Sequence, residues 1–331
     1  MILNTSDLHR QAEQRLQNAA YSPKRLVLIH TAISLGASLL ITFINFLFSR
    51  QIAGTGGLSG LDTRSVLATV QSVLELAVTV LLPFWEVGLV GAMLCWVKGE
   101  PANFSTLLGG FRRFGTFLAQ KLMLGLVFFA MGTAILYFGA TVFMVSPFSG
   151  ELTAALEPVM EEAGSMLSSE ILLSEEVMAQ VGDAVTPLLV IFGILFVAVA
   201  IPVLYRVRFA EFFAMEGSRA LVSLLESVRI TRKNVWQIVK LDLSFWWFYL
   251  LQGLSVALCY GDTMLQAVGI SLPMSADGAF FLFYVLGILC QGLLLWQYQA
   301  KVSTAYGLAY KALCDAPAPA PSQSANVPWD N

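Results

Sequence analysis

The stretch LVLIHTAISLGASLLITFINFLF, residues 26–48, contains no Asp, Glu, Lys or Arg. A helix of about 20 apolar residues crosses the hydrocarbon core of a bilayer, so this stretch predicts a transmembrane helix. The whole chain has the same character, because 57% of its residues are hydrophobic and only 12% are charged. Soluble domains carry about 25% charged residues. We therefore expect an all-α, polytopic integral membrane protein in contact with the lipid bilayer.

Long apolar segments recur along the chain and predict about six transmembrane helices. They cover residues 26–48, 73–97, 118–145, 185–205, 243–260 and 279–299. Of the 19 Lys and Arg residues, only Arg50 and Arg64 fall in segments that alternate counting places outside. Because basic residues concentrate in cytoplasmic loops, this bias indicates the orientation. Both the N and the C terminus are expected in the cytoplasm.

The composition of the non-spanning segments divides the chain into three regions. Residues 1–25 are polar and basic, with apolar residues at helical spacing, and predict a cytoplasmic amphipathic helix. Residues 26–314 form the six-span membrane domain. Its loop 146–186 has no Lys or Arg and eight acidic residues, so it is expected to face outward. Residues 315–331 are rich in Pro and Ala and predict a disordered cytoplasmic tail.

Two amphipathic stretches suggest a parallel internal repeat with an offset of 117 residues. Their apolar positions are Phe104, Leu107, Leu108 and Phe111, and then Leu221, Leu224, Leu225 and Val228. This spacing places the apolar side chains on one face of a helix. Pro83 and Pro202 precede the two stretches inside apolar spans, where a proline removes a backbone hydrogen bond and kinks the helix. Each copy would contain a kinked span, an interfacial amphipathic helix and a returning span.

Motifs in the later part of the chain carry a resemblance to a known family. They are Pro202, Tyr205, Ser227, Lys233, the run LDLSFWW at residues 241–247, and the later Tyr298, Ala305, Tyr306 and Tyr310. In these residues the chain resembles the bacterial integral membrane proteins of domain-of-unknown-function family 975. The resemblance implies a location in the bacterial inner membrane, which is the plasma membrane. It implies no activity, because the family has none established.

Glu86 is the leading candidate for a functional residue inside the membrane, because ionisable side chains there are costly and often functional. Glu75 lies eleven residues earlier, and eleven steps of about 100° return to nearly the same helix face. The two carboxylates could line one polar track for protons or cations. In the alternative, Glu75 lies in water at the outer interface. Glu86 is then protonated, or paired with Arg206 or Arg208 for packing alone.

Basic residues flank the two amphipathic stretches. These residues are Arg112, Arg113, Arg229, Arg232 and Lys233. They are expected to rest on anionic lipid headgroups at the cytoplasmic face. Nucleic-acid binding is not expected, because the bilayer already covers the apolar faces of these helices. The chain has only two His residues and no HExxH motif, so no metal, cofactor or enzymatic activity is predicted.

Three classes of function are compatible with these features. A non-enzymatic scaffold or accessory membrane protein explains the topology and the missing motifs, and it predicts protein partners or a homo-oligomer. A transporter or channel for a small solute, proton or cation explains the repeat, the prolines and Glu86. A membrane-embedded enzyme would need an acid, a base and a nucleophile that converge, and the sequence shows no such set. The scaffold is the favoured interpretation, and the transporter is the alternative.

Overall fold

The computed structural model describes residues 4–19, 21–54, 60–145, 150, 154, 175–270 and 273–316. Within these ranges the secondary structure is helical and contains no β-strand, which confirms the predicted all-α fold. Most of the acidic loop 146–186 and the tail beyond residue 316 lie outside the described residues.

Five helices of the described chain are long and apolar enough to cross a membrane. They are α2 (Pro23–Gly54), α3 (Gly60–Lys98), α6 (Phe114–Val145), α8 (Glu175–Val207) and α14 (Ala276–Cys314). A sixth span exists only if α11 (Val235–Ser244) and α12 (Trp246–Cys259) are counted as one, and these two helices are bent by 65°. The predicted number of about six spans is therefore confirmed as five or six.

The bend corrects the expected continuous span at residues 243–260. Phe245 leaves helical geometry, with φ −108° and ψ 19°, and separates α11 from α12. Its ring is buried between the His9 ring, at a centroid distance of 4.2 Å, and the Tyr306 ring, at 6.5 Å. Packing of this ring accompanies the interruption, and hydropathy alone does not reveal it.

Two of the long helices exceed the spans that the sequence predicted. Both α3 and α14 contain 39 residues. At a rise of 1.5 Å per residue each is about 58 Å long, roughly twice the thickness of the hydrocarbon core. In α14 the residues from 302 to 310 are buried within the protein. This part of α14 therefore packs on protein and not on lipid.

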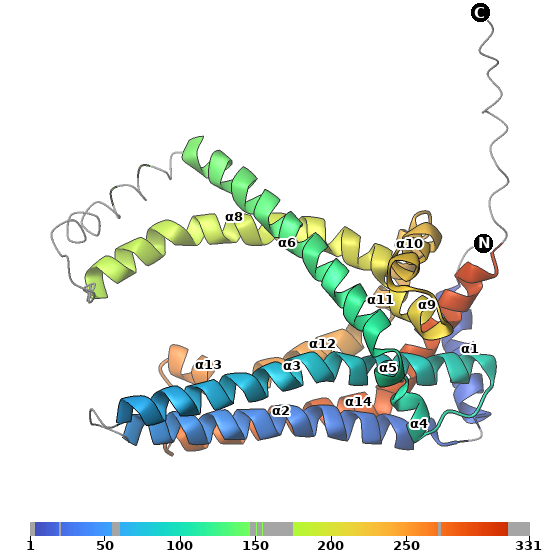
Figure 1. Cartoon of the computed structure of the whole chain (residues 1–331), viewed down its shortest axis with the longest axis horizontal. Coiled ribbons are helices and arrows are strands. Elements are labelled where there is room, and N and C mark those ends of the chain that lie inside the picture. Colours follow the sequence, from blue (N-terminus) through green and yellow to red (C-terminus); the bar gives the residue numbers. More distant parts are fainter. Residues whose placement is uncertain are drawn as a thin grey trace, which may run out of the picture. The chain divides into compact units, whose positions relative to one another are not determined.

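The chain forms two compact units, each described here by itself. Unit 1 comprises Met1–Phe117 and Phe209–Asn331, and unit 2 comprises Leu118–Arg208. In unit 1, α2, α3 and α14 run side by side, and α12 packs on α14 (Figure 1). In unit 2, Gly139 of α6 meets the Phe192 ring of α8. A Cβ at Gly139 would lie 2.2 Å from that ring, so only glycine permits this approach.

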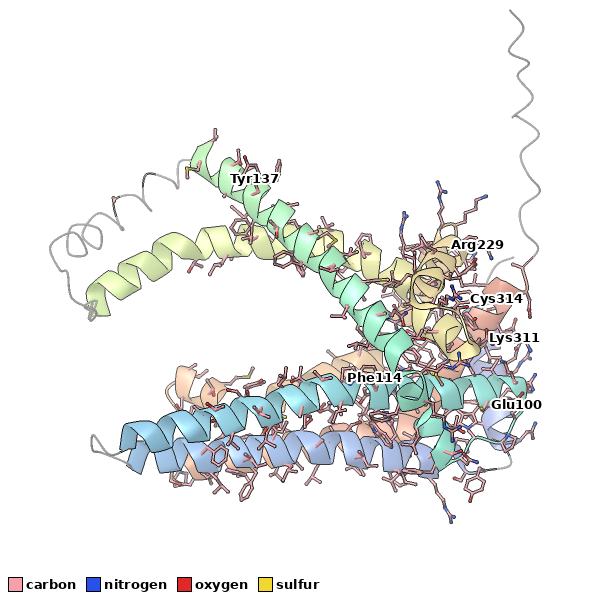
Figure 2. The ribbon with its side chains drawn as sticks, in the orientation of Figure 1. Glu100, Phe114, Tyr137, Arg229, Lys311 and Cys314 are labelled. Atoms are coloured by element: carbon pink, nitrogen blue, oxygen red, sulfur yellow. The ribbon has the colours of Figure 1, made fainter. Side chains whose placement is uncertain are left out.

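Five short helices gather at one end of unit 1 (Figure 1). They are α1 (Thr5–Gln17), α4 (Phe104–Leu107), α5 (Gly109–Arg112), α9 (Ala210–Glu216) and α10 (Ala220–Thr231). Arg229 and Lys311 also lie at this end (Figure 2). We call it the basic end.

Helix α1 is the amphipathic helix that the N-terminal sequence predicts. The side chain of Asn4 caps it by accepting a hydrogen bond from the backbone N–H of Ser6. Leu8 and Ala12 on its apolar face are buried, and the helix contacts α14, α3 and α11. The apolar face of α1 is therefore covered by protein instead of by the membrane surface.

The large buried side chains of the described residues lie mainly towards the basic end. Those with almost no exposed surface are Trp96, Phe117, Phe209, Phe245, Leu107, Ile238, Leu241, Val27, Val87, Val97, Thr231 and Thr304. The spanning parts of the helices are less covered, and Leu40 of α2 is 60% exposed. Exposed apolar side chains are what a helix surrounded by lipid requires. The packed core is thus concentrated at one end of unit 1.

The internal repeat stays a prediction. The first amphipathic stretch forms the two four-residue helices α4 and α5, whereas the second forms α10 with 12 residues. One further pair of residues is separated by nearly the predicted repeat offset of 117 residues. Gly99 (φ 79°) and Gly217 (φ 116°) both have a left-handed backbone and follow the ends of α3 and α9. Pro83 and Pro202 lie inside α3 and α8, and neither proline ends its helix.

Candidate functional site

Glu75 and Glu86 both lie on the face of α3 that meets α2. Glu75 accepts hydrogen bonds from Asn45 Nδ2 at 2.6 Å and from Gln71 Nε2 at 3.3 Å. Glu86 accepts one from Ser34 Oγ at 2.8 Å. Ser34 and Asn45 are eleven residues apart on α2, which is the spacing of the two glutamates on α3. One face of each helix therefore supplies the polar groups.

His30 of α2 completes this row next to Glu86. Its side chain is buried and stacks on the Trp85 ring at a centroid distance of 5.4 Å with an interplanar angle of 7°. Nε2 of His30 lies 3.7 Å from Oε2 of Glu86, which is too long for a hydrogen bond. Within the described residues this nitrogen has no hydrogen-bond partner. We call the row of His30, Ser34, Asn45, Glu75 and Glu86 the polar seam.

Close backbone packing fixes α4 and α5 beside the part of α3 that carries Glu86. A Cβ at Gly88 would lie 1.8 Å from the carbonyl oxygen of Leu107, and one at Gly110 would lie 2.0 Å from that of Phe84. Neither position has room for a side chain. The amphipathic stretch of α4 and α5 therefore lies at the level of Glu86 along α3.

The sequence also proposed Arg206 and Arg208 as partners of Glu86. Both arginines belong to unit 2, whereas Glu86 belongs to unit 1, and their pairing stays a prediction. The structure instead places Ser34 and His30 beside Glu86. Sequence reasoning missed His30, because one His in an apolar run forms no motif. Its position four residues before Ser34, on the same helix face, was the available signal.

The basic residues predicted to meet lipid headgroups divide into two groups. Arg113 is half-buried, and its Nη1 donates a hydrogen bond of 2.8 Å to the carbonyl oxygen of Ala214 near the end of α9. It therefore connects two segments of the basic end. The remaining residues are exposed: Arg112, Arg229, Arg232 and Lys233.

Two hydrogen-bonded networks join helices at the basic end. In the first, Glu216 of α9 accepts from Lys98 Nζ of α3 at 2.8 Å and from the Tyr310 hydroxyl of α14 at 2.6 Å. In the second, the Tyr306 hydroxyl of α14 donates to Asp242 of α11 and bonds the Tyr249 hydroxyl of α12 at 2.7 Å. Tyr306 and Tyr310 belong to the motifs that the family resemblance rests on. Both residues connect helices.

The fold defines the class of the molecule as a helical, multi-pass membrane protein. Comparison of the chain with family models, curated proteins and solved structures finds no match. The resemblance to domain-of-unknown-function family 975 accordingly stays a prediction.

The polar seam offers a carboxylate, an imidazole, a hydroxyl and amides along one helix interface. Such groups can bond two helices together or hold a proton or small cation. Among the described residues, no group of three or more His, Cys, Asp or Glu side chains is placed to hold a metal ion.

Proposed function

We propose that this chain is a non-enzymatic scaffold or accessory protein of the bacterial inner membrane, with both termini in the cytoplasm. The observation that carries the proposal is the position of the packed core. The largest buried side chains lie mainly towards the basic end, where five short helices meet the ends of α3 and α14. Transporters commonly build their substrate site near the bilayer midplane. A core at one end instead gives a rigid surface on which other proteins can assemble.

The hydrogen bonds of the polar seam support the same proposal. Asn45 and Gln71 donate to Glu75, and Ser34 donates to Glu86, so each carboxylate already has a partner within the α2 and α3 pair. Polar side chains that bond across helices hold transmembrane bundles together, at about 0.6 to 2 kcal/mol for each bond. In this account the seam fastens α2 to α3.

The depth of the two carboxylates follows from the same arrangement. If α4 and α5 lie among the headgroups, Glu86 is close to the cytoplasmic boundary of the bilayer. Eleven residues of helix separate it from Glu75, which is then about 16 Å deeper and near the bilayer centre. A carboxylate at that depth needs hydrogen-bond donors, and Asn45 and Gln71 supply them.

A transporter or channel for a proton or small cation is the second candidate. One observation favours it. His30 Nε2 has no partner among the described residues and faces Glu86 Oε2 across 3.7 Å, a gap that a water molecule could bridge. In this account Glu86 and His30 exchange the transported ion at the cytoplasmic boundary.

Two surfaces of the proposed scaffold have different neighbours. The exposed basic residues of α5 and α10 contact anionic headgroups, which attract Lys and Arg within about 10 Å of the membrane surface. The remaining surface of the basic end contacts protein, either another membrane protein or a second copy of this chain.

Site-specific photo-crosslinking in bacterial cells tests the proposal. A photoreactive residue is placed at Lys311, which is exposed at the basic end and is not one of the residues assigned to headgroups, and as a control at Leu126 of α6, which is 68% exposed. The scaffold account predicts a discrete protein adduct at Lys311 and lipid adducts alone at Leu126. Lipid adducts alone at Lys311, and also at the exposed Asp315, would contradict it.

A further inference from the structure

A polar cavity lies between α1 and the end of α3 at the basic end. Its volume is about 350 Å³, and its lining includes Gln11, Gln14, Arg15, Asn18, Trp96 and Glu100. Pockets that hold small molecules begin at about 300 Å³, so this cavity fits a compact ligand. It is separate from the polar seam, which runs between α2 and α3.

Two helix ends build this cavity. The lining residues of α1, from Gln11 to Asn18, follow the spacing i, i+3, i+4 and i+7 and so share one face beside the buried face of Leu8 and Ala12. On the other side α3 ends at Lys98, and Gly99 takes a left-handed conformation with φ 79°. The buried ring of Trp96 forms part of the wall.

Two opposite charges in the lining are not held in a salt bridge. Within the described parts of the chain, neither Arg15 nor Glu100 forms a salt bridge. The nearest basic side chain in sequence to Glu100 belongs to Lys98, and it pairs with Glu216 at 2.8 Å. A guanidinium and a carboxylate therefore face the same cavity without neutralising each other.

The helix backbone makes the Glu100 side of the cavity more negative. Helix α3 ends at Lys98 beside Glu100, and the C-terminal end of a helix carries a partial negative charge. The side of Glu100 therefore favours a cation. Arg15 favours an anion, because its planar guanidinium can donate two parallel hydrogen bonds to a carboxylate or phosphate. The carboxamides of Gln11, Gln14 and Asn18 can donate and accept hydrogen bonds between these two poles.

We infer that this cavity binds a small zwitterion, a molecule that carries a primary ammonium and a carboxylate or phosphate a few bonds apart. The ammonium lies at Glu100, and the anionic group lies at Arg15. Two sources offer this chemistry: a free amino acid of the cytoplasm, and the phosphoethanolamine headgroup of a membrane lipid. The inference does not depend on the scaffold or the transporter proposal.

The test uses the full chain in nanodiscs of phosphatidylglycerol and phosphatidylcholine, which have no primary ammonium. L-Alanine and O-phosphoethanolamine are titrated calorimetrically, with ethylamine and inorganic phosphate as probes that carry only one of the two charges. We expect saturable binding of at least one zwitterion, at least about tenfold tighter than either single-charge probe. No saturable binding of either zwitterion up to about 10 mM, or equal binding of a single-charge probe, overturns the inference.

Substitutions at the two charged residues locate the binding. Arg15→Gln and Glu100→Gln should each weaken the binding of the zwitterion by about tenfold or more, because each removes one charge-assisted contact. Arg15→Lys keeps the charge and should restore part of the affinity. Arg10→Gln is the matched control, since Arg10 is exposed on α1 and pairs with Asp7 at 3.1 Å outside the cavity. Unchanged affinity in both Gln variants, with folding verified by thermal unfolding, overturns the assignment to this cavity.

Nanodiscs that contain phosphatidylethanolamine then distinguish the two sources. If the lipid headgroup is the ligand, binding of the soluble probes is lost in these nanodiscs and returns when the lipid is omitted. If a free amino acid is the ligand, the affinity for L-alanine is the same in both lipid mixtures. Either result supports the zwitterion site.

Discussion

Asn45 of α2 donates a hydrogen bond of 2.6 Å to the carboxylate of Glu75 on α3. The two residues lie on neighbouring helices of unit 1, both of which are long and apolar enough to cross a membrane. Inside a bilayer no water replaces a lost donor, so this bond satisfies a carboxylate that would otherwise be costly. The same relationship recurs eleven residues away, where Ser34 donates to Glu86.

The Asn45 bond predicts a loss of stability on substitution. Asn45→Leu keeps the size of the side chain and removes the donor to Glu75. We expect the free energy of unfolding to fall by about 1 to 2 kcal/mol, measured in detergent by thermal or denaturant unfolding. Leu40→Val on the same helix is the control, because Leu40 is exposed. If Asn45→Leu unfolds like the control, the seam does not fasten the two helices.

A side chain added at Gly88 is expected to clash at the contact between α3 and α4. In Gly88→Ala the new Cβ would lie 1.8 Å from the carbonyl oxygen of Leu107, so the two segments must separate. We expect a loss of about 1 to 3 kcal/mol, or failure to express. Gly115→Ala is the matched control, since a Cβ there meets nothing within 4 Å, and it should leave stability unchanged or slightly raised. Equal stability of the two variants would contradict the packing.

The hydroxyl and the ring of Tyr310 are expected to contribute different amounts to the free energy of unfolding. Tyr310→Phe removes the hydroxyl that donates to Glu216 and also meets the Cys314 thiol, but Glu216 keeps Lys98 as a partner, so about 1 kcal/mol of unfolding free energy should be lost. Tyr310→Ala also removes the ring that packs on Phe209 and Phe212, and the loss should reach about 3 to 5 kcal/mol. Chemical denaturation of the two variants in detergent measures both values. Equal losses would show that the ring contributes nothing.

Protonation of His9 is expected to detach α1 from the rest of unit 1 as the pH falls. Burial lowers the pKa of His9 below its usual value of 6.5, and the positive charge of Lys301 lowers it further, while Glu13 acts in the opposite direction. The neutral imidazole bonds Ser244 Oγ at 2.8 Å and stacks on Phe245. Because the folded pKa lies below the unfolded one, this contribution is complete above pH 6.5 and is lost as the pH falls through the folded pKa.

Hydrogen exchange of the α1 amides between pH 8 and about pH 5, corrected for the intrinsic rate, measures this detachment. The pKa of Glu13 is also lowered, mainly by its hydrogen bond to Lys301, so the Glu13–Lys301 pair is lost only below the usual glutamate value of 4.5. The window above pH 5 thus reports on His9. His9→Gln should abolish the change in protection across this window. The same change in wild type and His9→Gln would assign it to another group.

The helical class and the spacing of the seam could be predicted from the sequence, because both follow from local periodicity. Apolar runs longer than 20 residues are difficult to place in any other structure, and the eleven-residue interval puts Glu75 and Glu86 on one face by helix geometry alone. The partners on α2 could not be predicted. Nothing in the sequence states which face of α2 meets α3, and many apolar pairings are equally compatible with hydropathy.

The break at Phe245 and the docking of α1 depend on contacts between residues far apart in the chain. Phe245 sits between His9 and Tyr306, which lie near opposite ends of the sequence. The apolar residues continue through the break, so hydropathy placed residues 243–260 in one span and did not show the break near its start. The cavity at Arg15 and Glu100 was missed for the same reason, since its lining joins residues 11 to 19 with residues 96 to 100.

The most direct test of the scaffold account is ion flux through purified protein in lipid vesicles. Proton movement is followed with a trapped pH-sensitive dye, and sodium and potassium movement with ion-selective dyes, for wild type, Glu86→Gln and the surface control Asp7→Asn. The scaffold account predicts that all three proteins give the flux of protein-free vesicles. Flux present in wild type and Asp7→Asn but absent in Glu86→Gln would contradict it and establish Glu86 as part of an ion pathway.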